Sequence, residues 1–229
     1  VVLVSHGGSG KTILAEAMLS AAGATTRIGT IEDGTTASDF EPEEIRRQTS
    51  IQTTILPCLW KDHKINVIDT PGFADFRGQV NSGIRVADSA VVIVAAPSGV
   101  EVGTQQMWNL IGSRGLPRAI FISKMDRENA DFQRTVDSIT EKFGRQCVPV
   151  NLPVGAESSF SNVFDLLDPS VEAPSDLVGD VDAWRERLTE AIAETDDALA
   201  IKFVDGDVIG HEELIEGLEQ GVATGQIVP

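Results

Sequence analysis

The feature that most constrains the fold of this chain is the alternation of short apolar runs with longer amphipathic ones. Several of the short runs are almost wholly apolar, which is typical of strands buried on both faces of a sheet. The predicted strands are VVLVS (1–5), IQTTILPCLW (51–60), KINVIDT (64–70), SAVVIVAAP (89–97) and RAIFISK (118–124). Helices are predicted between most of them, at 11–22, 100–113 and 129–143. This order predicts an α/β fold with a mostly parallel sheet and helices on both faces.

The later part of the chain has a different composition. From about residue 155, Asp, Glu, Pro and Ser become more frequent, and acidic amphipathic helices follow near 181–204 and 210–220. We interpret this part as an inserted α/β subdomain. The expected division is a core domain at 1–154, an insert at 155–215 and a return to the core at 216–229. The chain starts inside one apolar strand and stops at the start of another, so we expect a fragment of a longer protein.

The charge balance argues against several classes of partner. The 229 residues include 35 acidic and 18 basic side chains, which gives a net charge of −17 at pH 7. Such a surface repels nucleic acids and anionic membranes, so we expect direct binding to neither. No apolar run approaches the roughly 18 residues of a membrane-spanning helix, and no secretory signal opens the sequence. We therefore expect a cytoplasmic protein, and a monomer; Cys58 and Cys147 lack metal-ligand spacing and are expected to be reduced thiols without function.

A glycine-rich turn, SHGGSGKT at 5–12, joins the first predicted strand to the first predicted helix. Backbone N–H groups in such a turn can surround phosphate oxygens while the helix N-terminus adds partial positive charge. Lys11 would bridge the β- and γ-phosphates of a nucleotide, and the Thr12 hydroxyl would bind Mg²⁺. Serine replaces the first glycine of the usual pattern, which is tolerable if its backbone needs no positive φ. The candidate phosphate-binding residues are Ser5, His6, Gly7, Gly8, Ser9, Gly10, Lys11 and Thr12.

The alternative for this turn is a plain connection between a strand and a helix. A second motif, DTPG at 69–72, favours the nucleotide interpretation because it ends the apolar strand INVI. In that position Asp69 can reach a phosphate-bound Mg²⁺ through water, and the Gly72 N–H can meet the γ-phosphate.

A third motif, SKMD at 123–126, ends another apolar strand. Asp126 would accept two hydrogen bonds from guanine, and the stem of Lys124 would lie over the ring. Adenine offers the wrong donors and would leave the carboxylate unpaired. Three motifs in this order, each at a strand end, predict a guanine-nucleotide site.

These motifs stand in runs that resemble a known family. CLWKDHKINVIDTPGFADF, ISKMDRENAD and VPVNLPVGAE are similar to the GTP-binding domain of bacterial elongation factor G, especially its divergent elongation-factor-G-like paralogues. The resemblance covers nearly the whole chain, and it implies a P-loop NTPase fold whose inserted subdomain corresponds to 155–215. It also implies GTP and GDP as ligands, Mg²⁺ as a cofactor, and the ribosome as partner of the full-length protein.

The resemblance implies one further metal ligand, and the chain differs from the family at three positions of the site. IRRQTSI, at 45–51, falls on the family's first switch segment, so Ser50 takes the place of the threonine that binds Mg²⁺ and keeps its hydroxyl. Phe73 stands where the family has the histidine that orients the attacking water, and phenylalanine cannot make that hydrogen bond. Gly8 replaces an aspartate near the phosphates. Ser123 replaces the asparagine that tethers the base-binding loop.

We interpret Phe73 as a hydrophobic gate beside the switch and assign no certain catalytic residue. The prediction is a GTPase domain that retains GTP and GDP binding, with hydrolysis that is slow or ribosome-dependent. One alternative is a GTP-gated, ribosome-associated regulator without turnover. Another is a ribosome-protection or release-type translational GTPase. The family's last guanine-contacting motif, a Ser-Ala loop, is expected shortly after residue 229.

Overall fold

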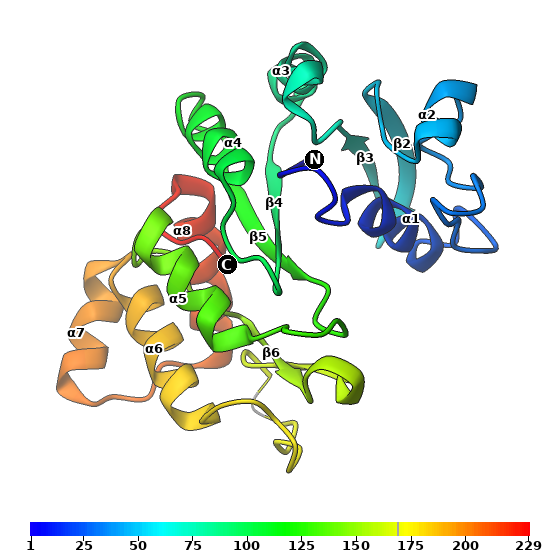
Figure 1. The fold of residues 1–229 in the computed structure, drawn as a ribbon. Coiled ribbons are helices and arrows are strands. Elements are labelled where there is room, and N and C mark those ends of the chain that lie inside the picture. Colours follow the sequence, from blue (N-terminus) through cyan, green and yellow to red (C-terminus); the bar gives the residue numbers. More distant parts are fainter. Residues whose placement is uncertain (169) are drawn as a thin grey trace. The chain divides into compact units, whose positions relative to one another are not determined.

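The computed structural model describes residues 1–168 and 170–229. The chain divides into two compact units, whose elements are labelled in Figure 1. The first unit consists of Val1–Ala95 and Glu101–Leu116, and the second of Ala96–Val100 and Pro117–Pro229.

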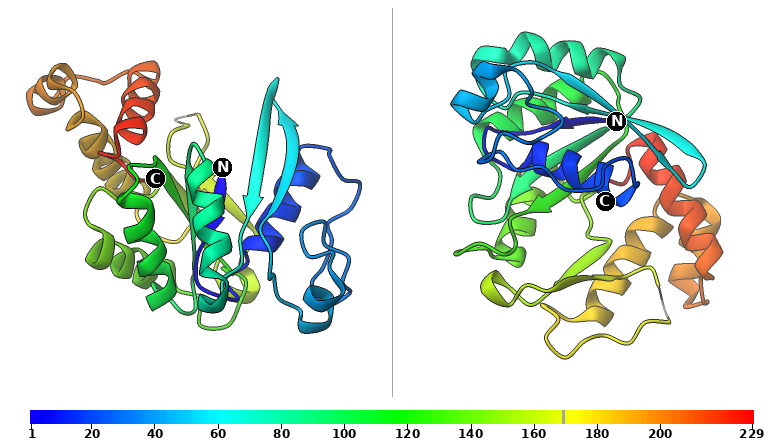
Figure 2. Two further views of the ribbon diagram at one scale, coloured as in Figure 1. Left: turned by 90° about the horizontal axis from the view of Figure 1, so that it is seen from above. Right: turned by 90° about the vertical axis from the view of Figure 1, so that its right-hand side faces the viewer.

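The strands of the first unit belong to one sheet and lie in the order β2-β3-β1-β4. They are β1 (Val2–Val4), β2 (Thr54–Trp60), β3 (His63–Asp69) and β4 (Ala90–Ala95). Strand β1 runs parallel to β3 and β4, with Val2 opposite both Ile68 and Ala90. Strand β2 is antiparallel to β3, and the two strands lie side by side along their whole length (Figure 2). The predicted α/β fold with a mostly parallel sheet is confirmed.

Helices cover both faces of this sheet. Val67 packs with Ala15 and Leu19 of α1 (Lys11–Ala21). The next residue, Ile68, lies against Gly83 of α3 (Arg77–Val86). Because successive side chains of a strand point to opposite faces, α1 and α3 lie on opposite faces of the sheet.

The first unit contains three further helical segments. Helix α4 (Val102–Gly112) packs beside β4, and a single 3-10 turn (Ala74–Phe76) precedes α3. Helix α2 (Pro42–Arg47) is too short to show a helical period, so the sequence pattern does not predict it. Its composition still suits a helix, with proline in the first turn and arginines in the last.

The second unit begins with two elements that the sequence predicts. Strand β5 (Arg118–Ser123) is followed by α5 (Phe132–Phe143), which starts three residues later than expected. The delay arises because residues 124–130 form two tight turns, closed by hydrogen bonds from Arg127 N–H to Lys124 O and from Ala130 N–H to Arg127 O. The Asp131 carboxylate then accepts the Arg134 N–H and caps the helix.

The rest of the second unit is a hairpin followed by three helices. Strands β6 (Asn151–Val154) and β7 (Asn162–Asp165) are antiparallel, with a 3-10 turn (Glu157–Ser159) between them. The helices are α6 (Val181–Ala193), α7 (Asp197–Asp205) and α8 (His211–Thr224). Phe132, Ile192 and Ile227 belong to one hydrophobic cluster, so all three predicted parts of the chain contribute to this core. The division at 155 and 215 stays a prediction.

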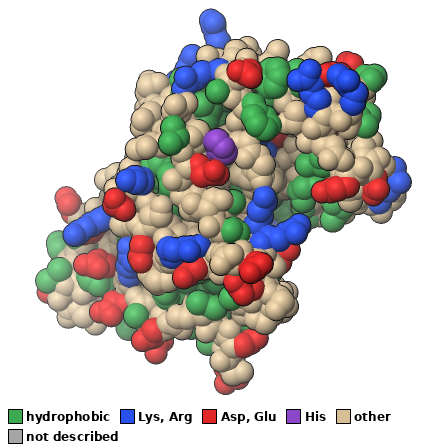
Figure 3. Space-filling model, viewed as in Figure 1, with side chains coloured by type: hydrophobic (Ala, Val, Ile, Leu, Met, Phe, Trp, Pro, Cys, Tyr) green, Lys and Arg blue, Asp and Glu red, His purple; other side chains and the backbone are tan. Residues whose placement is uncertain are grey.

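The membrane, thiol and charge expectations can be compared with the structure. No helix among the described residues is long and apolar enough to cross a bilayer. Cys58 and Cys147 are buried free thiols, and burial raises the pKa of Cys147 to about 12. On the face shown in Figure 3, acidic side chains are interspersed with Lys and Arg.

Candidate functional site

The glycine-rich turn follows β1 and leads directly into α1. Gly8 and Gly10 have φ angles of 75° and 101°, which L side chains rarely adopt. Ser5 has no positive φ, so the condition for a serine at this place is met. Lys11 and Thr12 form the first turn of α1, and both side chains are buried.

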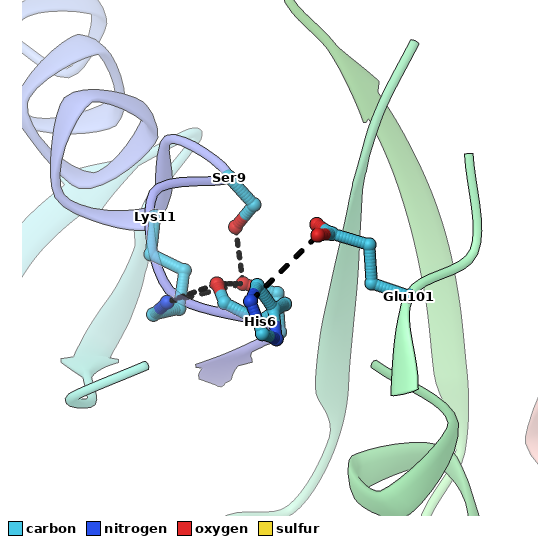
Figure 4. A network of polar contacts seen from close by, with 5 residues as sticks. His6, Ser9, Lys11 and Glu101 are labelled. Atoms are coloured by element: carbon cyan, nitrogen blue, oxygen red, sulfur yellow. Dashed lines mark hydrogen bonds and ion pairs between the residues drawn. The ribbon is translucent and has the colours of Figure 1, made fainter. Parts of the chain in front are cut away.

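The Ser5 hydroxyl forms contacts within the loop that glycine could not form. It contacts the Ser9 hydroxyl across the loop and accepts a hydrogen bond from Lys11 Nζ at 3.0 Å. Lys11 Nζ also donates to His6 O at 3.1 Å, so its amine is directed at the first residues of the loop (Figure 4). Burial lowers the pKa of Lys11 to about 8, while Asp69 and Asp39 act in the opposite direction. The loop therefore holds a buried cation.

The three predicted metal-binding side chains, Thr12, Ser50 and Asp69, meet at the start of α1. Thr12 Oγ1 donates to Asp69 Oδ2 at 2.8 Å. Because its single proton is used there, the Ser50 hydroxyl at 3.2 Å must donate to Thr12. Asp69 Oδ2 also accepts from Ser38 Oγ at 2.6 Å. Burial raises the pKa of Asp69, and the hydroxyls of Ser38 and Thr12 oppose that shift.

Among the described residues, none is a hydrogen-bond partner for three buried carboxylate oxygens of this site: Asp69 Oδ1 and both oxygens of Asp39. Burial raises the pKa of Asp39 to about 6, against the influence of the nearby Ser50 hydroxyl. Orphaned buried oxygens of this kind are uncommon, because their desolvation is costly. Carboxylate and hydroxyl oxygens are the ligands of hard cations, so the donor set fits Mg²⁺.

Asp39 and Ser38 are residues that the sequence analysis misses. Neither stands at a strand end or in a recognisable motif, and both lie in the segment between α1 and β2. Only the folded structure reveals them, because there the segment packs against Asp69 and Ser38 donates a hydrogen bond to its carboxylate. A polar pair flanked by loop residues gives no periodic signal that would reveal it.

The loop after β3 contacts the glycine-rich turn directly. A Cβ at Gly72 would lie 2.5 Å from Lys11 Nζ and 2.7 Å from Gly7 Cα, so this close approach requires glycine. Phe73 follows, and its ring atoms lie 3.3 Å from where a Cβ of Gly7 would be. The ring therefore occupies space that a side chain at position 7 would need. Although half-exposed, Phe73 places an apolar surface against the loop.

His6 connects the turn to the start of α4. Its Nε2 lies 3.7 Å from Glu101 Oε1, the residue that precedes α4 (Figure 4). A Cβ at Gly103 would lie 2.5 Å from His6 Nδ1, so the imidazole packs closely against the first turn of this helix. These contacts support a packing role for His6.

The predicted guanine-binding residues lie in the second unit, at the end of β5. Ser123 is buried, Lys124 has a φ of 60°, and the side chain of Asp126 is 63% exposed, with Arg127 Nε 3.7 Å away. The exposed carboxylate is available to a ligand.

Glu157, in the turn between β6 and β7, holds this loop on both sides of Asp126. Its N–H donates to Met125 O at 2.9 Å, and its carboxylate accepts the Asn129 N–H at 2.6 Å. Sequence analysis misses Glu157 because the contact joins positions about thirty residues apart. The only local signal is its positive φ of 50°, which the sequence does not reveal.

The chain is similar to known proteins over most or all of its length. The chain matches the family described as the elongation factor Tu GTP binding domain over residues 1–220. It is similar to a protein of known structure from Thermus thermophilus, with a TM-score of 0.91 and 32% sequence identity. The match covers 100% of this chain and 36% of that one, so the chain spans about a third of its length. The chain therefore belongs to the elongation factor Tu GTP-binding domain family, the GTPase domains of translation factors.

Proposed function

We infer that this domain is the guanine-nucleotide switch of an elongation-factor-G-like translation factor that binds GTP and GDP with Mg²⁺ and hydrolyses GTP slowly. The observation that carries the proposal is the first turn of α1: Lys11 directs its ammonium at the glycine-rich turn, and the neighbouring Thr12 joins the Ser50 and Asp69 oxygens. Adjacent residues at the start of one helix thus supply a cation for phosphate and oxygen ligands for a metal.

Each residue of the site has a proposed task in binding. The N–H groups of the turn surround phosphate oxygens, and Lys11 neutralises the charge of the β- and γ-phosphates. Thr12 and Ser50 would hold Mg²⁺ through their hydroxyls and Asp69 would do so through water, while Asp39 would add a second carboxylate. When bound, the ion neutralises charge on the phosphates. Gly72 offers its N–H to the γ-phosphate, and Asp126 with Lys124 recognises guanine.

Slow hydrolysis follows from Phe73. Phosphate, metal and base contacts stabilise the bound ground state, whereas orientation of the attacking water acts on the transition state. Phenylalanine has no hydrogen-bonding group with which to hold a water molecule. Its ring against Gly7 also places an apolar surface at the turn. Binding is therefore expected to be retained while turnover depends on another group, such as one supplied by the ribosome.

Phe73, which cannot orient a water molecule, also favours a second candidate function. If no other group orients the water, the protein is a GTP-gated regulator of the ribosome that binds GTP without turning it over. A ribosome-protection or release-type GTPase has the same domain and would differ in its other domains. In each case we infer a monomer that acts in the cytoplasm, where it meets the ribosome through the full-length protein.

Equilibrium binding of GTP, GDP and ATP to the intact protein, in Mg²⁺ and in EDTA, tests this function. We expect both guanine nucleotides to bind and ATP to bind roughly 10³-fold more weakly, because adenine leaves the Asp126 carboxylate unpaired. EDTA should lower the affinity for GTP. Failure to bind any guanine nucleotide in Mg²⁺ would contradict the proposal.

A further inference from the structure

Two buried glutamates hold the long segment between α1 and β2. Within residues 29–52, all of which the structure describes, α2 is the one regular element. This segment nevertheless provides Ser38, Asp39 and Ser50 to the metal site. Its conformation must therefore be fixed by contacts other than regular secondary structure.

Glu16 links the two ends of the first half of the segment, residues 29–37, through hydrogen bonds. It belongs to α1 and is 2% exposed. Its Oε2 accepts the Gly29 N–H at 2.8 Å, and its Oε1 accepts the Ala37 N–H at 2.6 Å. The enclosed turn is tight, because a Cβ at Gly29 would lie 2.4 Å from Thr35 O. Ala37 directly precedes Ser38, whose hydroxyl donates to Asp69.

Glu44 closes the second half in the same way. It lies in α2 and is 1% exposed. Its Oε1 accepts the N–H groups of Ile51 and Gln52 at 2.9 and 3.0 Å, and its Oε2 accepts the Glu41 N–H at 3.2 Å. Ile51 directly follows Ser50, whose hydroxyl donates to Thr12.

The two carboxylates are satisfied by backbone alone. Among the described residues neither forms a salt bridge, and five N–H donors take the place of a cation. A buried carboxylate is tolerated only where such charge-assisted hydrogen bonds replace its hydration. The reverse also holds: among the described residues these N–H groups have no other acceptor, so they depend on the glutamates. Each bond joins protein atoms, so the arrangement does not require a nucleotide.

We propose that Glu16 and Glu44 are positioning residues that preform the metal-binding wall of the site by fixing the residues next to Ser38 and Ser50. The link to Mg²⁺ rests on the proposed function, whereas the ordering of the segment does not. Loss of either carboxylate releases backbone N–H groups beside a site hydroxyl. Binding of the nucleotide then has to order the segment as well, and this cost weakens binding. A higher Mg²⁺ concentration is therefore needed to retain the nucleotide.

Hydrogen exchange at single amides of the intact, nucleotide-free protein tests the proposal. The variants are Glu16→Gln and Glu44→Gln, in which the amide group cannot accept both sets of N–H donors. The matched control is Glu43→Gln, because the Glu43 side chain is half-exposed and pairs with the side chains of Arg46 and Arg47. In the native protein the amides of Gly29, Ala37, Ile51 and Gln52 should be protected.

We expect exchange to accelerate at least about tenfold at the amides that lose their acceptor, because the one carbonyl oxygen of glutamine replaces only one carboxylate oxygen. These are Gly29 or Ala37 in Glu16→Gln, and either Glu41 or the pair Ile51 and Gln52 in Glu44→Gln. Amides of β3 and α5 should keep their protection in both variants, and Glu43→Gln should behave as the native protein. The Mg²⁺ concentration for half-maximal GDP retention should rise several-fold in the two variants alone. If either variant unfolds as a whole, Glu16→Asp or Glu44→Asp replaces it, since the shortened carboxylate keeps its charge but loses its reach.

Unprotected amides at Gly29, Ala37, Ile51 and Gln52 in the native protein would overturn the proposal, as would variants that exchange like the control. Because the exchange measurement needs no nucleotide, the two hypotheses can fail separately. Absence of GTP binding by the native protein counts against the proposed function, and unchanged exchange counts against the role of the glutamates.

Discussion

The proposed phosphate-binding residues and the proposed base-binding residues have different surroundings. In the first unit, Lys11 and Asp69 are buried, and Asp69 is enclosed by hydroxyl donors. In the second unit, the Asp126 side chain is 63% exposed, and exposed Glu157 holds its loop. Burial makes the charges of the first region costly to the fold and strong toward a ligand. Substitutions there should change stability and binding together, whereas those around Asp126 should change binding alone.

Lys11→Met gives the largest expected effect. The affinity for GTP should fall roughly 10²-fold or more, because removing a buried charge from its partner costs about 3–5 kcal/mol. The free energy of unfolding should stay constant or rise, since methionine fills similar volume without a buried ammonium. Binding titration and thermal unfolding measure the two effects, with Lys142→Met as the control at a side chain that is 43% exposed. If Lys11→Met bound GTP with native affinity, Lys11 would not be part of the phosphate-binding site.

Asp39→Asn should separate folding from metal binding. Both Asp39 oxygens are buried without a hydrogen-bond partner, so the neutral amide should raise the free energy of unfolding in EDTA by about 1 kcal/mol. The same change should weaken the Mg²⁺ dependence of GTP binding by about tenfold. Asp75→Asn, at an exposed position, is the control for charge alone. Lower stability of Asp39→Asn in EDTA would show that the carboxylate is paired, against this account.

Glu157→Gly should give the smallest effect and act on binding alone. The affinity for GTP should fall about three- to tenfold, because the Asn129 N–H loses its acceptor. Stability should be unchanged, since glycine adopts the positive φ of this position more easily than glutamate. Glu157→Gln keeps an acceptor and should bind GTP almost as the native protein does. Equal affinities for the two variants would show that the side-chain contact does not position the base loop.

Sequence reasoning locates the elements whose pattern is local. The five apolar strands and the helices α1, α4, α5 and α8 follow from periodicity and flanking glycines. The stretch 181–204, predicted as one helix, forms two, α6 and α7, because the Asp196 side chain caps a new helix. Sequence reasoning also anticipates that Thr12, Ser50 and Asp69 meet, because two of them follow or end neighbouring parallel strands and the third lies in the resembling switch segment. Their roles in binding stay proposals.

The contacts that sequence reasoning misses depend on how irregular segments close. Asp39 and Ser38 reach the site because Glu16 and Glu44 fold residues 29–52 against Asp69. Glu157 reaches the base loop because β6 and β7 form a hairpin that carries its turn to Met125. Ser38, Asp39 and Glu157 lie outside the periodic stretches. Glu16, Glu44 and Glu157 accept backbone N–H groups, which any residue type offers. Such contacts leave no pattern in the sequence.

The most direct test of the account is GTP turnover by the intact protein, with and without ribosomes, measured beside GTP binding in the native protein and in Phe73→His. Phe121→His, at an exposed phenylalanine of β5, is the matched control. The account predicts that the native protein and both variants bind GTP, that intrinsic hydrolysis by the native protein is slow, and that histidine at position 73 accelerates it. Rapid intrinsic hydrolysis by the native protein, unchanged or reduced in Phe73→His, would contradict it.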